Sequence, residues 1–186
     1  MIIKLTNVRL SFPCLWTPRK FSEADTKGSY SASFILDKTD HAKLIADIRK
    51  TIDLLVREKL KGKNPGPRNI CLRDGSEKPD TVGYGDGIMF INARTDKAPL
   101  VVDERANPLE ENPNKPVGGD YVNATIELWA QDNAFGKRIN AKLRGVQFFK
   151  RGEAFGSGRI DPKTEFAPIA GENDEFTAVA DDESPV

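Results

Sequence analysis

The sequence predicts a mainly β protein: a five-stranded β-barrel with one amphipathic helix, long loops and an acidic C-terminal tail. Three observations support this fold class. Apolar and polar residues alternate in several short segments, as they do in strands with one buried face. One segment, residues 40–60, changes to the three- and four-residue spacing of an amphipathic helix. No basic residue follows Lys163, and acidic residues accumulate there instead.

Two strands are expected near the N-terminus. Alternation within residues 2–12 predicts a first strand with an inner face of Val8, Leu10 and Phe12. Pro13 and Pro18 are expected to end it, because proline has no amide hydrogen for a strand ladder, so that residues 13–28 form a loop. The second strand is expected over residues 29–36, with an inner face of Tyr30, Ala32, Phe34 and Leu36.

The predicted helix follows, and its apolar residues recur on one side: Leu44, Ile48, Ile52, Leu55, Val56 and Leu60. We expect Thr39 or Asp40 to cap its start, Gly62 to end it, and its apolar face to pack on the barrel. Residues 61–87 are rich in glycine, proline and charge, which predicts a long loop with little regular structure.

The second half of the chain predicts four more strands: residues 88–96, 100–102, 120–131 and 137–149. The last two are expected to form a hairpin across the turn Asp132–Gly136, and Gly145 is expected to mark a β-bulge that bends the second of them. About five strands, a helix between early strands and long loops indicate a barrel of the OB type. A β-sandwich is the alternative.

The outer face of the hairpin is the candidate binding surface. Period-two alternation places five aromatic or basic side chains on it: Tyr121, Trp129, Arg138, Lys142 and Arg144. If core residues pair with core residues, Glu127 lies opposite Lys142, and Trp129 lies near Asn140. Cations that follow phosphates and rings that stack on bases are typical of single-strand binding. Burial of Trp129 under the helix or in a dimer interface, and a merely solvated basic face, are the alternatives.

The same combination of aromatic and basic residues recurs twice. The predicted loop after the first strand contains Trp16, Arg19, Lys20 and Phe21, and the end of the last strand contains Lys150 and Arg151. These residues join the candidate nucleic-acid-binding set. Of the neighbouring Phe148 and Phe149, one is expected to lie in the core.

The charge distribution divides the chain into two parts. Residues 1–163 carry all 28 basic residues against 21 acidic ones, a net charge of +7, whereas residues 164–186 carry seven acidic residues, or −7. We therefore predict a folded nucleic-acid-binding domain over 1–163 and a disordered acidic tail over 164–186. A tail that only keeps the protein in solution is the alternative.

Other functional classes find little support. His41 is the only histidine, which excludes a histidine triad and a multi-histidine metal site. The glycine-rich residues 83–87 lack the lysine and helix of a phosphate-binding loop, and the spacing of Asp74, Asp86 and Asp96 does not favour a Mg²⁺ site. No enzyme activity, metal or cofactor is expected.

Signals for export and for membrane insertion are also missing. The sequence has no signal-peptide pattern and no apolar stretch of about 20 residues, which favours the cytoplasm over a membrane. Cys14 and Cys71 are expected to be free thiols.

A family resemblance covers most of residues 1–155. Its pieces are VRLSFP (8–13), YSASFIL (30–36), LRDG (72–75), GY (83–84), INAR (91–94), GGDYVNATIELWAQDN (118–133) and GKRINAKLRGVQFF (136–149). In their order and spacing they resemble a family of tailed-phage single-stranded DNA-binding proteins with an OB fold. The resemblance implies that fold, single-stranded DNA as partner, and a setting in DNA replication or recombination in the host-cell cytoplasm.

The acidic tail is similar to those of better-known bacterial and phage single-strand binders, which recruit replication proteins. Many of those tails end in an aromatic residue, whereas this one ends Asp-Asp-Glu-Ser-Pro-Val. Its candidate partner-binding residues are Phe176, Asp181, Asp182 and Glu183. Assembly as a homodimer also stays open. The alternative functions are a phage assembly protein whose basic face binds another protein, and a metal-dependent nuclease.

Overall fold

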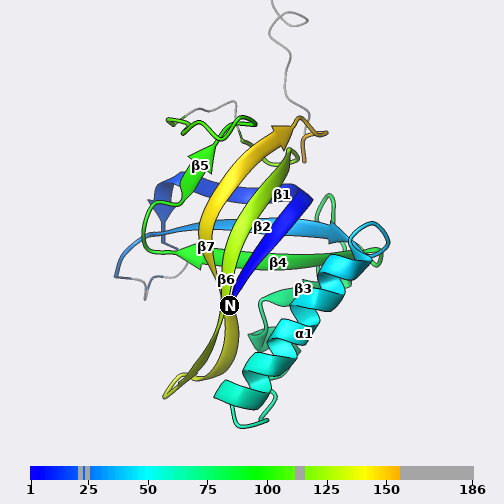
Figure 1. Cartoon of the computed structure of the whole chain (residues 1–186), viewed down its shortest axis with the longest axis vertical. Coiled ribbons are helices and arrows are strands. Elements are labelled where there is room, and N and C mark those ends of the chain that lie inside the picture. The colour runs from blue at the N-terminus through cyan, green and yellow to red at the C-terminus, as the bar shows by residue number, and fades with distance from the viewer. Residues whose placement is uncertain (21–22, 24–25, 112–115, 156–186) are drawn as a thin grey trace, which may run out of the picture.

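A closed β-barrel forms the centre of the computed structural model, which describes residues 1–20, 23, 26–111 and 116–155. The described residues form seven strands in one sheet: β1 (Ile2–Arg19), β2 (Ser29–Asp37), β3 (Leu72–Asp74), β4 (Ile88–Thr95), β5 (Leu100–Val102), β6 (Tyr121–Asn133) and β7 (Gly136–Lys150). The sheet order is β3-β4-β2-β1-β6-β7-β5, and an additional pairing of β4 with β7 closes five strands into the barrel (Figure 1).

Around this barrel the strands follow the order β1-β2-β4-β7-β6 and return to β1. All pairs are antiparallel except β4 with β7, which is parallel. Closure confirms the predicted five-stranded OB-type barrel and shows that the sandwich alternative is wrong.

The hairpin of β6 and β7 has the expected register. Glu127 pairs with Lys142, and Trp129 pairs with Asn140. The register shifts between Thr125 and Ile126, opposite Gly145 and Leu143, so the predicted bulge at Gly145 is confirmed. The bulge leaves one extra residue on β7 and bends this strand around the barrel.

The core of the barrel is made by alternate residues of its strands. The largest side chains that are fully buried there are Leu5, Leu10, Phe34, Leu36, Ile91, Ile126, Leu128, Ile139 and Leu143. Phe148 is also buried and Phe149 is exposed, as the sequence requires of one of the two.

Helix α1 (Ala42–Lys59) packs on the barrel against β6 and β7 through Ile45, Ile48, Ile52 and Leu55. The prediction that Thr39 or Asp40 caps it is wrong. His41 occupies the N-cap position without a side-chain cap, because the Asp37 carboxylate accepts the amides of Thr39 (2.7 Å) and Asp40 (3.0 Å). Both hydrogen bonds lower the pKa of Asp37, and the one from the Asp40 amide has the larger effect. The helix ends before the expected Gly62: its last residue is Lys59, Leu60 is the C-cap, and Lys61 is the first residue with a positive φ (+54°). Gly62, with φ +72°, follows and donates to the Val56 carbonyl.

The first strand differs most from expectation. β1 continues to Arg19 instead of ending at Pro13, and its pairing with β2 shifts register between Ser11 and Cys14 and again before Arg19. Each proline lies in one of these irregular stretches, where the lost ladder bond matters least. The first shift turns Phe12 outward, so its predicted place on the inner face is wrong: 61% of it is exposed.

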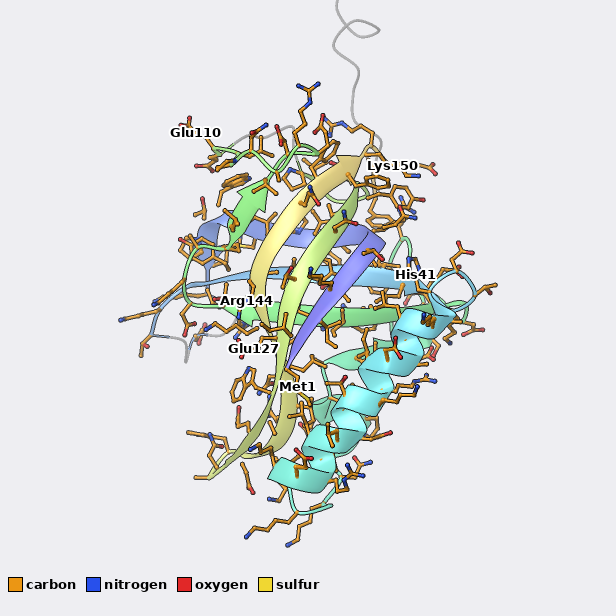
Figure 2. All side chains as sticks on the ribbon, viewed as in Figure 1. Met1, His41, Glu110, Glu127, Arg144 and Lys150 are labelled. Atoms are coloured by element: carbon orange, nitrogen blue, oxygen red, sulfur yellow. The ribbon has the colours of Figure 1, made fainter. Side chains whose placement is uncertain are left out.

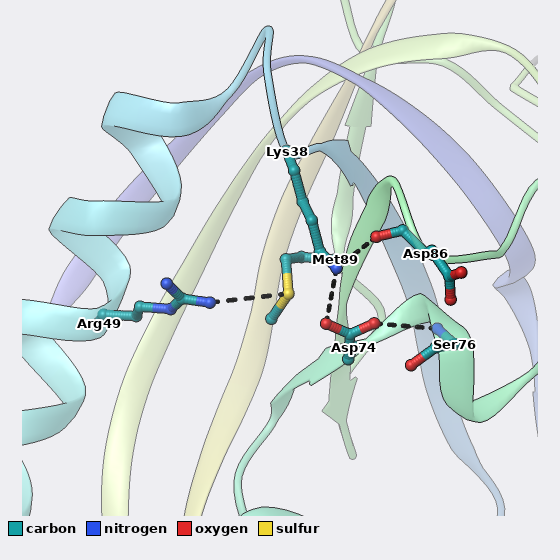
Figure 3. Close-up of polar contacts among 6 residues, drawn as sticks. All are labelled: Lys38, Arg49, Asp74, Ser76, Asp86 and Met89. Carbon is teal, nitrogen blue, oxygen red and sulfur yellow. Dashed lines mark hydrogen bonds and ion pairs between the residues drawn. The ribbon is translucent and has the colours of Figure 1, made fainter.

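The segment 61–87 is more regular than predicted. It contains β3, which pairs with β4, and two 3-10 turns, η1 (Pro67–Asn69) and η2 (Gly75–Glu77). Lys38 holds this segment to the end of β2, because its Nζ donates to the Asp74 carboxylate at 2.7 Å and to the Asp86 carbonyl (Figure 3). The hydrogen bond from Lys38, followed by one from the Ser76 amide, lowers the pKa of Asp74 to about 2.

Among the described residues there is no helix with the length and apolar character needed to cross a membrane.

Candidate nucleic-acid interface

A groove of about 1190 Å³ crosses the outer surface of the barrel. Its walls come from six strands, β3 with Arg73 among them, and from the turn η1 before β3. Strands β1, β2 and β4 contribute residues around Phe12, Ser31–Ser33 and Asn92–Asp96, and strands β7 and β6 contribute Arg138–Lys142 and residues around Trp129. The groove therefore follows the order of strands around the barrel and crosses them instead of running along one.

The groove is strongly positive. Six cations line it, Arg19, Arg68, Arg73, Arg94, Arg138 and Lys142, against only two acids, Asp96 and Glu127. Arg73 is already engaged, because its Nε donates to Glu77 at 3.0 Å. Low-dielectric walls lined by one sign of charge concentrate the field, so the groove attracts a polyanion.

Backbone pairing explains why the cations converge. Arg94 of β4 pairs with Lys142 of β7, at the point where these two strands close the barrel. Successive residues of a strand alternate between its faces, so Asn92 and Arg94 point outward while Ala93 is buried. Asn92 also accepts a hydrogen bond from the Ser33 hydroxyl at 2.6 Å, which links β4 to β2 in the groove floor.

Trp129 supplies an aromatic surface in this positive setting. It lines the groove and is 44% exposed, so it is not covered by α1. The neighbouring carboxylate of Glu127 lies 3.6 Å from the Arg144 guanidinium. Figure 2 labels the two residues close together on the hairpin. Arg144 therefore offsets the charge of Glu127, and it is not among the residues that line the groove.

The other hairpin residues predicted for the site lie at the far end of the two strands. Tyr121 is half-buried, with the Lys150 ammonium 4.7 Å and the Arg9 guanidinium 5.6 Å from its ring centre. Arg151 contacts the buried carboxylate of Asp120 at 3.2 Å. Figure 2 places Lys150 at the end of β7, well away from Glu127. The structure thus divides the predicted face into a groove part and a separate cluster of Tyr121, Lys150 and Arg151.

The predicted loop residues are also separated. Trp16 is half-buried and packs against the core, Arg19 lines the groove, and Lys20 is exposed just beyond β1. Phe21 lies outside the described residues. So do the tail residues Phe176, Asp181, Asp182 and Glu183, and the boundary between 1–163 and 164–186.

Four aromatic or basic groove residues were missed from the sequence: Phe12, Arg68, Arg73 and Arg94. The alternation of INAR (91–94) was the one available signal, since it turns Arg94 outward beside Asn92. Arg68 and Arg73 come from the segment read as an irregular loop, and only tertiary packing brings that segment to the groove.

Within the described part of the chain, no three His, Cys, Asp or Glu side chains gather as a metal site would require. Cys14 and Cys71 are free and buried, as expected for unpaired thiols, and burial raises the pKa of Cys71 to about 12. His41 is half-buried, with its Nε2 3.1 Å from the Asn7 carbonyl.

Comparison with known proteins places this barrel in a family. Residues 1–177 match a family profile described as Enterobacter phage Enc34, ssDNA-binding protein. A curated relative, putative protein p50 of Acyrthosiphon pisum secondary endosymbiont phage 1, is 37% identical over 179 residues, which cover 91% of this chain and 95% of that one.

Solved structures agree with this assignment. The bacteriophage Enc34 single-stranded DNA-binding protein in complex with ssDNA is 31% identical, with a TM-score of 0.76 over 83% of this chain and 89% of that chain. The bacteriophage T7 single-stranded DNA-binding protein gp2.5 is 14% identical, with a TM-score of 0.55 over 90% of this chain and 98% of that chain, and shares the fold. Because the family profile matches residues 1–177 and the barrel is shared, this chain belongs to the Enc34 phage family of single-stranded DNA-binding proteins.

Proposed function

We propose that this protein binds single-stranded DNA without sequence preference along the positive groove, and that it acts in phage DNA replication or recombination. The observation that carries the proposal is the convergence of six cations and the exposed ring of Trp129 in one groove across the barrel. Cations bind phosphates whatever the sequence, and a ring stacks on any base, because every base has a π-face. The Enc34 protein, which was solved with ssDNA, shares this barrel.

The acidic tail supports a second part of the proposal. Its charge of −7 complements the +7 of residues 1–163, and the tether keeps it at a high effective concentration near the groove. The tail competes with DNA for the groove. When long single strands displace it, the tail becomes available to a phage or host replication protein through Phe176 and the acids at 181–183.

Intrinsic tryptophan fluorescence tests the binding directly. The full-length protein is titrated with single-stranded DNA, duplex DNA and RNA of equal length, with and without Mg²⁺. We expect tight, length-dependent binding to single-stranded DNA, a change in fluorescence that Trp129→Phe largely removes, and no cleavage. Trp16 remains in that variant as an internal reference, because it is half-buried against the core.

Two results would overturn the proposal. Failure to bind DNA or RNA would favour an assembly role, and Mg²⁺-dependent cleavage would favour a nuclease. Charge variants test the placement of the DNA: Arg138→Ala, in the groove, should weaken binding, whereas Lys50→Ala, on the exposed side of α1, should not. Equal effects of the two substitutions would contradict binding in the groove.

A further inference from the structure

We propose that Phe12 is a second stacking platform for a DNA base, at the opposite end of the groove from Trp129. The inference rests on the proposed binding of single-stranded DNA and adds a residue whose position in the sequence indicated burial.

The backbone turns Phe12 out of the barrel. Two residues of β1, Phe12 and Pro13, lie opposite the single residue Ala32 of β2, between the pairs Ser11–Ser33 and Cys14–Ser31. This bulge gives Phe12 a φ of +45°, a left-handed conformation that residues with a Cβ adopt at a cost. The result is an apolar ring that lines the groove and is 61% exposed. Strained backbone that exposes a side chain is concentrated at functional sites.

The ring of Phe12 is held from one side. Its centre lies 6.3 Å from that of Tyr84, and Tyr84 in turn meets the fully buried Phe90 edge-on at 5.1 Å. The Tyr84 hydroxyl donates to the Ser11 hydroxyl at 3.2 Å, which fixes Tyr84 to the strand that carries Phe12. The rings therefore connect Phe12 to the core, and a ring that is already ordered loses little entropy when a base stacks on it.

A lysine accompanies these rings. The Lys78 ammonium lies 5.4 Å from the centre of Phe12 and 4.7 Å from that of Phe90. Removal from water lowers the pKa of Lys78, in keeping with its position among the rings. An aromatic surface beside a cation is the combination that single-strand binders use for a base and its phosphate.

Phe12 and Trp129 are too far apart to share a base. The groove crosses β1, β2, β4, β7 and β6, so four interstrand steps of about 4.8 Å separate the two residues along the groove, an arc of about 19 Å. The direct pairing of β1 with β6 does not bring the two residues together, because it ends at Ile2 with Glu127, at the start of β1. One strand of DNA along the groove would therefore meet the two rings with different bases.

Substitutions that keep the bulk of the side chain test the inference. Phe12→Leu should weaken binding to a long single-stranded oligonucleotide by about 5- to 150-fold, the range of one base stack, with an unchanged melting temperature. Phe12→Tyr should bind like the wild type. Phe149→Leu is the matched control, because Phe149 is 46% exposed on β7 outside the groove.

The double variant Phe12→Leu, Trp129→Leu tests the separation. Its loss should equal the product of the two single losses, because distant sites act independently. The inference is overturned if Phe12→Leu binds like Phe149→Leu, or if it lowers the melting temperature and weakens duplex and single-strand binding alike. If either result is found while Arg138→Ala still weakens binding, only the role of Phe12 is rejected and the groove stands. If the wild-type protein does not bind single-stranded DNA, the proposed function itself is rejected.

Discussion

The dependence of DNA affinity on salt follows from the charges of the groove. Six cations line it, but Arg73 already bonds to Glu77 and Arg94 is also engaged, so we count four for phosphates: Arg19, Arg68, Arg138 and Lys142. Each phosphate contact on a single strand contributes about −0.7 to the slope of log affinity against log salt, so we expect a slope of about −2.8. Between 50 and 200 mM salt, affinity should then fall about 50-fold.

One substitution isolates a single contact. Lys142→Ala should change the slope by about 0.7, because it removes one phosphate contact. Lys150→Ala is the control, since Lys150 lies over Tyr121 at the far end of β7 and does not line the groove. The measurement is a fluorescence titration of both variants and the wild type with one oligonucleotide at four or more salt concentrations.

The outcomes separate clearly. A wild-type slope near zero would refute the electrostatic argument. A normal slope for Lys142→Ala with a reduced slope for Lys150→Ala would move the DNA to the cluster of Tyr121, Lys150 and Arg151.

Three further predictions concern stacking, the tail and pH. Trp129→Ala should weaken single-strand binding by about 1–3 kcal/mol while circular dichroism stays unchanged, because the ring is 44% exposed; unfolding would show a structural role instead. Deletion of residues 164–186 should tighten single-strand binding at low salt and relax discrimination against duplex, with the difference fading at high salt; equal affinities at low salt would end the competition model. The pKa of Asp74 is lowered to about 2, so its contribution to stability is present above the unfolded pKa near 3.8 and is lost as pH falls toward 2. Because the Asp74 side chain is 39% exposed, this contribution to the free energy of unfolding is about 1 kcal/mol or less. Lys38→Met should therefore reduce the loss of stability between pH 4 and 2, measured by urea titration. The same pH dependence in Lys38→Met and the wild type would contradict this role of the Lys38–Asp74 ion pair.

Local patterns determined most of the fold. The alternation in 120–131 and 137–149 predicted the hairpin, the pairing of Glu127 with Lys142 and the bulge at Gly145, because a period of two allows only one register that keeps apolar residues inside. The apolar spacing in residues 40–60 likewise predicted the helix, but not its N-terminal cap. There the Asp37 carboxylate bonds to the Thr39 and Asp40 amides, a local competition that residue type alone does not resolve.

The candidate site depended far more on tertiary structure. The outer face of the hairpin reads as one surface in sequence, but β6 and β7 coil around a closed barrel, so their outward residues point in different directions along their length. Trp129, Arg138 and Lys142 consequently face the groove, whereas Tyr121 and Lys150 form a second cluster.

Local residue patterns were sufficient to predict most of the barrel strands, the amphipathic helix, the hairpin register and the division of charge between residues 1–163 and the tail, because each depends on neighbours within a few residues. Only the folded barrel brings Arg68, Arg73 and Arg94 to Arg138 and Lys142, and only there does a bulge turn Phe12 toward them. Those positions depend on the closing contact between β4 and β7 and on the packing of the segment 61–87. Contacts between residues so distant in sequence leave no periodic signal in the chain.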